Sequence, residues 1–271
     1  MNLISVIITT YNWPEALAAS LQSLFAQVDH HFEILVADDG SSHATADMLK
    51  DRFFKGPVPL KHIRHDDRGF RAGTIRNKAV ANSIGDYLIF IDGDCIVFPD
   101  FISTHRNLAR QGYFVPGNRV LLSKPFTQAV LNKPIALYEL SFRNFFLYRL
   151  AGKINRIAPL LRLPLGPLRT IKPRHWQKAM TCNLGIWKQD FIEVNGFDEL
   201  FEGWGYEDSD LVIRLIHNGV KRKEGRFAVP VLHLWHRQND QSQHDQNLRR
   251  LMERLQQNDF IRAEKGLSQY D

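Results

Sequence analysis

Two groups of acidic side chains are the residues of this chain best suited to bind a cation or move a proton. Asp92 and Asp94 end a strand-length apolar run that begins at Tyr87, and a second acidic cluster at 207–210 follows the glycine-rich segment 203–206. No lysine or arginine adjoins the first pair in sequence. Such carboxylates form a site for a hard divalent cation, which in turn carries phosphates. The two clusters together indicate a metal-assisted transfer from a phosphorylated donor.

The apolar run before Asp92 indicates where these acids should lie. Continuous apolar stretches of this length are typical of buried strands in a parallel sheet. Ligands of open α/β sheets bind beyond the carboxyl ends of the strands. The alternative is a simple Asp-Gly turn, but a turn does not explain why two acids end so apolar a strand. We therefore expect Asp92 and Asp94 at the ligand-binding edge of a sheet.

The elements that would position the acids alternate in the first half of the chain. Strands are expected at 3–9, 32–37, 60–64 and 87–92, and helices at 14–27, 45–52 and 72–83. This alternation predicts an α/β fold with a right-handed, mostly parallel sheet flanked by helices. The second half is less regular. Strands are expected at 113–122, with an interruption at Pro116-Gly117, and at 182–187 and 229–235, and helices at 209–218 and 241–263.

Composition sets wide limits on the function. The 271 residues can bury one large α/β core, and 44% hydrophobic and 24% charged residues are ordinary globular values. The formal net charge of +6 fits an anionic ligand or an anionic membrane surface. No nucleic-acid partner is expected.

Cysteine content and the absence of sorting segments suggest the compartment. Only Cys95 and Cys182 occur, which gives no disulfide framework and no thiolate zinc site. The N-terminus runs directly into a strand, without the basic region and cleavage site of a signal peptide. No segment approaches the roughly 18 uninterrupted apolar residues of a spanning helix. We expect a cytoplasmic protein, either soluble or peripheral at the inner face of the membrane.

Several of these segments, taken in order, resemble a known enzyme family. Segments 6–12 (VIITTYN), 36–41 (VADDGS) and 92–94 (DGD) resemble the nucleotide-binding half of family-2 glycosyltransferases with the GT-A (Rossmann-like) fold. Segments 203–208 (GWGYED) and 233–236 (HLWH) resemble the acceptor segment of galactosyl- and N-acetylgalactosaminyltransferases and bacterial chondroitin-type polymerases. The resemblance covers residues 3 to 240 except for a basic middle segment.

The resemblance implies one GT-A domain over residues 1–271. Its nucleotide-sugar-binding half would be 1–111, and its acceptor-binding and catalytic half 112–240. Residues 241–271 would add a C-terminal helix. A helical or irregular basic insertion would interrupt the second half.

The resemblance also implies a metal site. Asp94 would bind the ion directly, and Asp92 would contact the ribose or metal-bound water. His233 and His236 have the spacing at which similar galactosyltransferases place metal ligands, although structural histidines are the alternative. The ion would be Mn²⁺ or Mg²⁺, and an imidazole ligand favours manganese.

By the same resemblance Asp208 is the candidate catalytic base. An inverting transfer needs a carboxylate within hydrogen-bond reach of the acceptor hydroxyl. Glu207 would then hold acceptor or donor hydroxyls, and Trp204 would offer a flat face to a sugar ring. The alternative is an acidic helix N-terminus that complements the helix dipole, and one loop can serve both purposes.

The nucleotide would be held by residues of the first half. Thr9, Tyr11 and Asp39 match family positions that hold uracil and ribose. An Asp that accepts the N3–H of uracil rejects cytosine, whereas thymine keeps this proton, so a dTDP-sugar remains open. Arg71 and Asn77 would reach the base or diphosphate, with a solvated helix face as the alternative.

The basic, aromatic segment 142–176 allows three interpretations: contact with anionic membrane, an acceptor-binding lid, or packing with solvated arginines. Prolines at 159, 164, 167 and 173 argue against one continuous helix. The resemblance favours the membrane, because bacterial sugar acceptors are often lipid-linked.

These observations predict an inverting, metal-dependent hexosyltransferase. It would move a hexose or N-acetylhexosamine, with galactose-type sugars favoured, from a UDP-sugar to a glycan or lipid-linked glycan in bacterial surface polysaccharide or lipopolysaccharide synthesis. A sugar-phosphate nucleotidyltransferase is one rival, but segment 9–14 (TTYNWP) lacks the glycine- and lysine-rich phosphate loop expected there. A non-catalytic sugar- or nucleotide-binding protein is the second rival. It is disfavoured because binding alone would not need a base in addition to a metal site.

Overall fold

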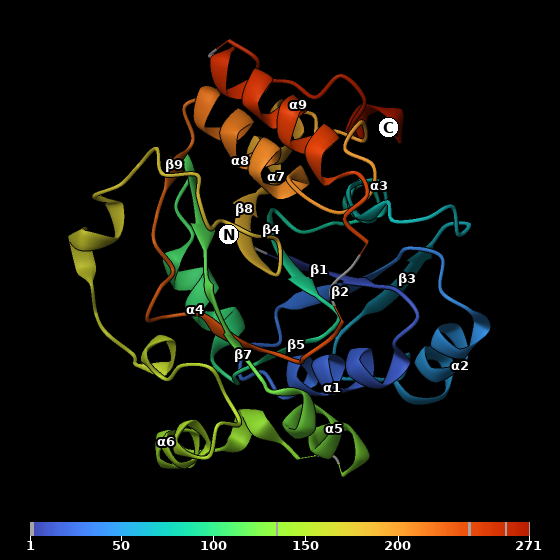
Figure 1. Cartoon of the computed structure of the whole chain (residues 1–271), viewed down its shortest axis with the longest axis vertical. Coiled ribbons are helices and arrows are strands. Elements are labelled where there is room, and N and C mark those ends of the chain that lie inside the picture. The colour runs from blue at the N-terminus through green and yellow to red at the C-terminus, as the bar shows by residue number, and fades with distance from the viewer. Residues whose placement is uncertain (1–2, 134, 238–239, 258, 271) are drawn as a thin grey trace.

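A central seven-stranded sheet organises the molecule (Figure 1). The computed structural model describes residues 3–133, 135–237, 240–257 and 259–270. The strand order is β3-β2-β1-β4-β8-β6-β9. The first four of these strands are parallel: β1 (Ile4–Thr10), β2 (Phe32–Asp38), β3 (Leu60–Arg64) and β4 (Tyr87–Asp92). Their carboxyl ends therefore share one edge of the sheet.

The other half of the sheet is mixed. Strand β8 (Asn183–Trp187) runs antiparallel to β4, and β6 (Tyr113–Pro116) runs antiparallel to β8. The short β9 (Lys221–Arg222) pairs in parallel with β6. The mostly parallel α/β sheet expected from the sequence is confirmed, with this mixed edge added by the second half of the chain.

Helices cover both faces of the sheet because successive strand residues point to opposite sides. Val6 and Ile8 pack with α1 (Pro14–Phe25) and α4 (Phe101–Leu108), whereas Ile7 packs on the other face. That face is covered by α3 (Ala72–Ala81), α7 (Lys188–Glu193) and α8 (Glu207–His217). Figure 1 shows α8 beside α9 (His244–Gln256), and α2 (His43–Arg52) next to α1. The final helix is shorter than the predicted 241–263, of which position 258 lies outside the described residues.

A second, three-stranded sheet lies beside the carboxyl end of β4. It has the order β5-β10-β7, formed by β5 (Cys95–Val97), β10 (Pro230–His233) and β7 (Asn118–Leu121). The strand expected over 113–122, with an interruption at Pro116-Gly117, is observed as two strands, β6 and β7, that belong to different sheets. The chain divides at Gly117, where a Cβ atom would lie 2.1 Å from the Asn183 amide. In the register of β10 with β5, His233 pairs with Cys95. This pairing brings the candidate ligand His233 beside the segment that follows Asp94.

The basic insertion consists of short helical pieces with a small core of their own. These are α5 (Lys124–Asn132), α6 (Phe142–Leu150) and the 3₁₀ turns Leu137–Glu139, Ala158–Leu160 and Gly166–Thr170. The expected absence of one continuous helix is confirmed. A further 3₁₀ turn, Leu267–Gln269, lies near the C-terminus. Within the described residues, no helix combines the length and apolar character needed to cross a membrane.

Candidate active site

A tight turn after β4 positions the first acidic pair. The Gly93 N–H donates to the Thr9 carbonyl at 2.7 Å, and a Cβ at this position would lie 2.9 Å from the same oxygen. Glycine therefore allows β4 to close against β1 at this point. Asp92 stays partly exposed, with 32% of its side chain accessible, whereas the Asp94 side chain is 11% accessible. The turn thus holds the two carboxylates in different environments at one edge of the sheet.

Two imidazoles face the carboxylate of Asp94. The Nε2 atoms of His233 and His236 lie 3.5 and 3.4 Å from its two oxygens. Each Nδ1 lies within hydrogen-bond distance of a main-chain carbonyl, 2.9 Å from Leu234 O and 2.8 Å from Arg237 O. Such a bond fixes the ring and leaves Nε2 free as a ligand, as outer partners of metal-binding histidines do.

This donor set fits a divalent cation. Two ligands of one ion, each about 2.1 Å from it, lie about 3 to 3.5 Å apart, which matches the imidazole–carboxylate spacings. The Cys95 sulfur also comes within 4.8 Å of the Asp94 and His233 donors. Burial raises the pKa of the Cys95 thiol well above its usual range, and its sulfur is a softer donor than the carboxylate and the imidazoles. The mixed oxygen–nitrogen set suits manganese.

Arg76 joins the two acidic clusters. This α3 residue is 4% exposed, and its guanidinium lies 3.2 Å from Asp92, 3.3 Å from Glu207 and 3.6 Å from Asp208. Its Nε donates to the Thr9 hydroxyl at 3.0 Å. The carboxyl end of β4 and the N-terminus of α8 therefore meet at one guanidinium group, that of Arg76. The first acidic pair, expected to lack a neighbouring cation, has one that is remote in sequence but adjacent in space.

The glycine-rich segment before α8 turns sharply to present its acids. Gly203 and Gly205 have φ of +72° and +115°, values that favour glycine, and Tyr206 is also left-handed at +71°. The Trp204 ring stacks on His244 of α9, with centroids 6.3 Å apart and planes at 15°. The Tyr206 hydroxyl and His244 Nε2 lie 3.0 Å apart. Trp204 is therefore held at the loop by α9.

Asp208 is oriented by Thr181, which precedes β8. The Thr181 N–H and hydroxyl donate to its two oxygens at 3.0 and 2.7 Å. Burial raises the pKa of Asp208, while Arg76 and the Thr181 bonds oppose the rise. Burial and the adjacent Asp208 charge raise the pKa of Glu207 to about 7. Both carboxylates are thus stronger bases than exposed ones, as a general base near neutral pH requires.

The nucleotide candidates lie on the loops after β1 and β2. Asp39 Oδ1 lies 2.6 Å from His65 Nε2, and Asp39 Oδ2 accepts the Arg71 N–H at 2.8 Å. The Tyr11 hydroxyl donates to Asp67 at 2.9 Å, and Tyr11 is 51% exposed. These bonds tie the 65–71 loop to the sheet edge. Thr9, as noted, touches Arg76 and so belongs to the same edge.

Asn77 lies elsewhere. It is fully buried, and its amide nitrogen donates to Phe197 O at 2.9 Å and Glu199 at 3.0 Å. Its Oδ1 accepts the Phe197 N–H at 2.9 Å. These bonds fix the 197–199 segment to α3, and they use the side chain that was expected to reach the nucleotide. Asn77 is therefore a structural residue here.

Sequence reasoning missed Arg76 and Thr181. Arg76 lies one position before Asn77 on a correctly predicted helix. The acidic pair itself could have indicated such a residue, because buried carboxylates require a positively charged group nearby. Thr181 carries no such signal, since only the packing of β8 beside α8 brings it to Asp208.

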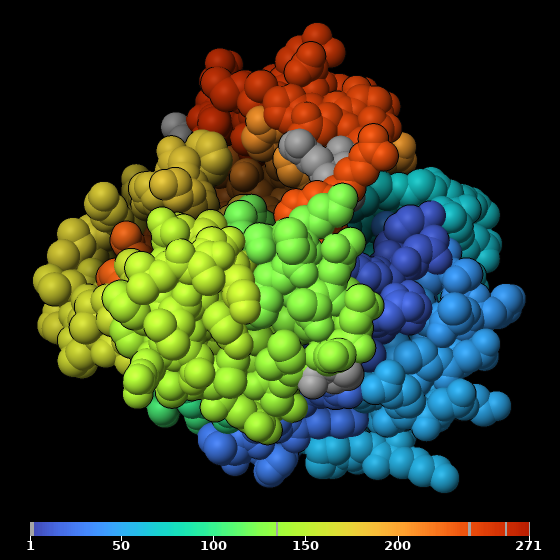
Figure 2. Space-filling model, turned by 60° about the horizontal axis from the view of Figure 1, so that its bottom comes forward, coloured from blue at the N-terminus to red at the C-terminus, as the bar shows by residue number. Residues whose placement is uncertain are grey.

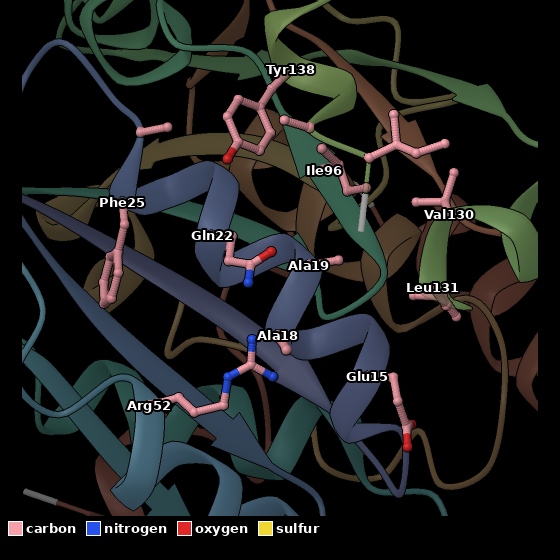
Figure 3. A pocket seen from close by; sticks show the side chains of 13 residues that line it. Glu15, Ala18, Ala19, Gln22, Phe25, Arg52, Ile96, Val130, Leu131 and Tyr138 are labelled. Atoms are coloured by element: carbon pink, nitrogen blue, oxygen red, sulfur yellow. The ribbon is translucent and has the colours of Figure 1, made fainter. Parts of the chain in front are cut away.

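A separate pocket of about 620 Å³ lies between α1 and the insertion (Figure 3). Its lining includes Ala18 and Gln22 of α1 and Val130 and Tyr138 of the insertion. None of the candidate nucleotide, metal or catalytic residues lines it. The candidate site at the sheet edge is therefore separate from this pocket.

Comparison with known families identifies the class of protein. Residues 5–158 match the model described as glycosyl transferase family 2, and residues 169–237 match the model described as N-terminal domain of galactosyltransferase. The first match spans more than half of the chain. The chain belongs to glycosyltransferase family 2, which confirms the enzyme class and both halves of the resemblance seen in the sequence.

Curated relatives agree with this assignment. The chain is 29% identical over 227 residues to validoxylamine A glucosyltransferase of Streptomyces hygroscopicus subsp. jinggangensis, covering 80% of this chain and 52% of the relative. It is 32% identical over 267 residues to the uncharacterized glycosyltransferase YfnE of Bacillus subtilis, covering 89% and 67%. Chondroitin synthase of Escherichia coli is 24% identical over 248 residues, covering 83% and 34%. The chain thus spans about half the length of the first of these relatives and a third of the last.

Solved structures share the fold. S. aureus TarS 1-349 superimposes with a TM-score of 0.61 at 14% identity, over 98% of this chain and 68% of that one. The mannosyltransferase PcManGT of Pyrobaculum calidifontis, solved with GDP-Man and Mn²⁺, gives 0.58 at 14% identity, over 85% and 56%. These likenesses confirm the GT-A-type architecture.

Proposed function

We propose that this chain is an inverting, metal-dependent glycosyltransferase that uses a UDP-sugar. It would transfer a hexose or N-acetylhexosamine, with galactose-type sugars favoured, to a hydroxyl of a glycan or lipid-linked glycan. The observation that carries the proposal is the position of Arg76, which contacts Asp92 and lies 3.6 Å from Asp208. The donor edge and the candidate base therefore share one site, as a single displacement requires.

The donor would bind at the edge formed by Thr9, Tyr11, Asp39, Arg71 and Asp92. TarS has been solved with UDP and with UDP-GlcNAc, which supports a uridine nucleotide for this fold. A dTDP-sugar is the alternative donor. The family match disfavours a nucleotidyltransferase.

Asp94, His233 and His236 would hold Mn²⁺ or Mg²⁺. The ion, when bound, supplies positive charge that offsets the leaving diphosphate. The structure of PcManGT with Mn²⁺ supports this choice for the fold. The imidazole–carboxylate spacings of 3.4 and 3.5 Å support it for these residues.

Asp208 would accept the proton of the acceptor hydroxyl. Thr181 aims its carboxylate, and burial makes it more basic. Glu207 would hold sugar hydroxyls, and Trp204 would stack on a sugar ring. The chondroitin synthase relatives and the galactosyltransferase model support a galactose-type sugar.

The enzyme would act in bacterial surface polysaccharide or lipopolysaccharide synthesis. We place it in the cytoplasm, peripheral at the inner face of the membrane, with segment 142–176 in contact with anionic lipid. The net charge of +6 supports an anionic surface as partner.

Thermal-shift and donor-hydrolysis screening tests the function. UDP-sugars, dTDP-sugars, GDP-mannose and ATP would each be added with and without Mn²⁺. We expect stabilisation and hydrolysis with UDP-sugars only when Mn²⁺ is present, and loss of the metal effect in Asp94→Asn. An equal response to ATP, or none to any nucleotide, would overturn the proposal.

A further inference from the structure

We propose that the outward face of α6 docks on the headgroup region of an anionic lipid bilayer, an inference whose biological role rests on the proposed function. Four large apolar side chains of this short helix are exposed: Phe142 by 45%, Phe146 by 49%, Leu147 by 52% and Leu150 by 71%. An ordinary surface helix presents polar residues to water instead.

Helical spacing places these side chains together. Phe142, Phe146 and Leu150 recur every four residues on one stripe, and Leu147 lies on the adjoining one. The opposite side is already used, because Phe145 is 2% exposed and packs with Tyr148 in the insertion core. The helix is thus anchored on one side and apolar on the other.

Exposed apolar groups concentrate in this part of the molecule. Half of the large hydrophobic side chains exposed in the described residues lie between positions 142 and 171. Scattered exposed hydrophobics need no explanation, but contiguous ones mark an interaction surface. Figure 2 shows the insertion, in green and yellow-green, as a continuous bulge of the surface.

The positive charge of this part of the chain favours an anionic bilayer as the partner of α6. Between Glu139 and Asp190 the chain has no acidic residue and ten lysines or arginines. Arg143 and Arg149 on α6 are exposed, and no ion pair of theirs occurs among the described residues. Apolar side chains interleaved with arginines suit the boundary between acyl chains and anionic headgroups. A second copy of the chain would bring these arginines together without acids, so self-association is disfavoured.

The packed side of α6 connects through α5 to the segment that carries the candidate metal ligands. Tyr148 of α6 contacts Phe126 of α5, with ring centroids 4.7 Å apart. In the same first turn of α5, Lys124 Nζ lies 4.9 Å from the ring of Trp235, which stands between the two candidate histidine ligands in the sequence. A bilayer under α6 would therefore be linked through α5 to this segment, and a lipid-linked acceptor would be presented from that side.

Vesicle flotation with the full chain tests the surface. Wild type, the triple variant Phe142→Ser/Phe146→Ser/Leu150→Ser and the charge variant Arg143→Glu/Arg149→Glu would be mixed with phosphatidylcholine vesicles, with or without phosphatidylglycerol. We expect wild type to float with the anionic vesicles only, and each variant to bind about tenfold or more weakly. Phe54→Ser/Ile84→Ser, which removes exposed apolar groups elsewhere (48% and 70% exposed), should bind like wild type.

The outcomes separate this proposal from the enzymatic one. UDP binding and donor hydrolysis should be unchanged in both α6 variants. Flotation, in turn, does not require UDP or a donor, so a failure of the catalytic proposal would not alter it. No wild-type flotation, equal binding to neutral vesicles, or an equal loss in the control would overturn the membrane proposal. A wild-type dimer in light scattering that dissociates in the triple variant, without vesicle binding, would assign the face to self-association and also overturn it.

Discussion

Arg76 of α3 lies 3.3 Å from Glu207 of α8, although 131 positions separate the two residues. The same guanidinium contacts Asp92 and Thr9, so one side chain links the first strand, the fourth strand and the last acidic cluster. Removing a buried cation leaves its carboxylates uncompensated. Both the geometry of the candidate site and the stability of the fold therefore depend on Arg76.

Substitution of Arg76 should be costly. We expect Arg76→Met to lower the free energy of unfolding by about 3–5 kcal/mol, because it breaks a buried charge network. Arg76→Lys should lose less, since it keeps the charge but lacks the planar fork that reaches several partners. Chemical denaturation measures both. Arg68→Met, which removes a solvent-exposed ion pair with Asp66, should cost no more than about 1 kcal/mol. Comparable losses in Arg76→Met and Arg68→Met would contradict the assigned role.

Asp208→Asn should separate catalysis from binding. We expect transfer to fall about 10²–10⁴-fold, because an amide cannot accept the acceptor's proton. UDP affinity should change little, since Asp208 lies across Arg76 from the donor edge. Initial rates and UDP calorimetry measure the two effects, with exposed Asp47→Asn as the matched control. Retained turnover with lost UDP affinity would refute the base assignment.

Replacement of the candidate metal ligands should weaken cation binding. His236→Ala and His233→Ala should each raise the Mn²⁺ concentration for half-maximal donor hydrolysis by at least 10–100-fold, the range seen even for outer partners of metal sites. His233→Ala should also destabilise the fold, because His233 is buried. Mn²⁺ titration followed by calorimetry gives the affinities. An unchanged Mn²⁺ affinity in both variants, equal to that of exposed His43→Ala, would remove the histidines from the site.

The raised pKa of Glu207 predicts a pH dependence of stability. The folded-state pKa is about 7, against an ordinary value of 4.5, so between these values the folded state binds the extra proton. Stability therefore falls as pH rises through this window and levels off above it. Glu207→Gln should remove this contribution, so its Tm relative to wild type should rise from pH 5 to pH 7. Differential scanning calorimetry at several pH values measures it, and a constant Tm difference would exclude the shift.

Much of the fold could be predicted because its first half is locally encoded. The strand Tyr87–Asp92 and the helix beginning at Pro14 match the sequence expectation, since an apolar run and a proline in the first helical turn are properties of neighbouring residues. The interruption of 113–122 at Pro116-Gly117 was expected, but the assignment of its two parts to different sheets was missed. Membership of two sheets is a tertiary property that periodicity does not report.

Part of the candidate site was predictable from a strand end and part only from family motifs. Asp92 and Asp94 lie at the carboxyl end of β4, as expected from its apolar run, whereas Asp208, expected from the resemblance, lies at the start of α8 near Arg76. Arg76 and Thr181 were missed, and Asn77 was misplaced, because their partners are more than 15 positions away in sequence. Side chains that contact motif residues but lie outside the motifs are positioned by helix and sheet packing, which the local sequence does not reveal.

The pairing of β10 with β5 assembles the candidate metal site from residues that lie far apart in the chain. The end of β4 and the candidate nucleotide-binding residues belong to the first hundred or so residues, whereas both candidate histidine ligands and the acids of α8 lie beyond position 206. A variant that lacks β10 and α8 would therefore lack the candidate cation ligands and the candidate base, whatever the state of its β1–β4 edge.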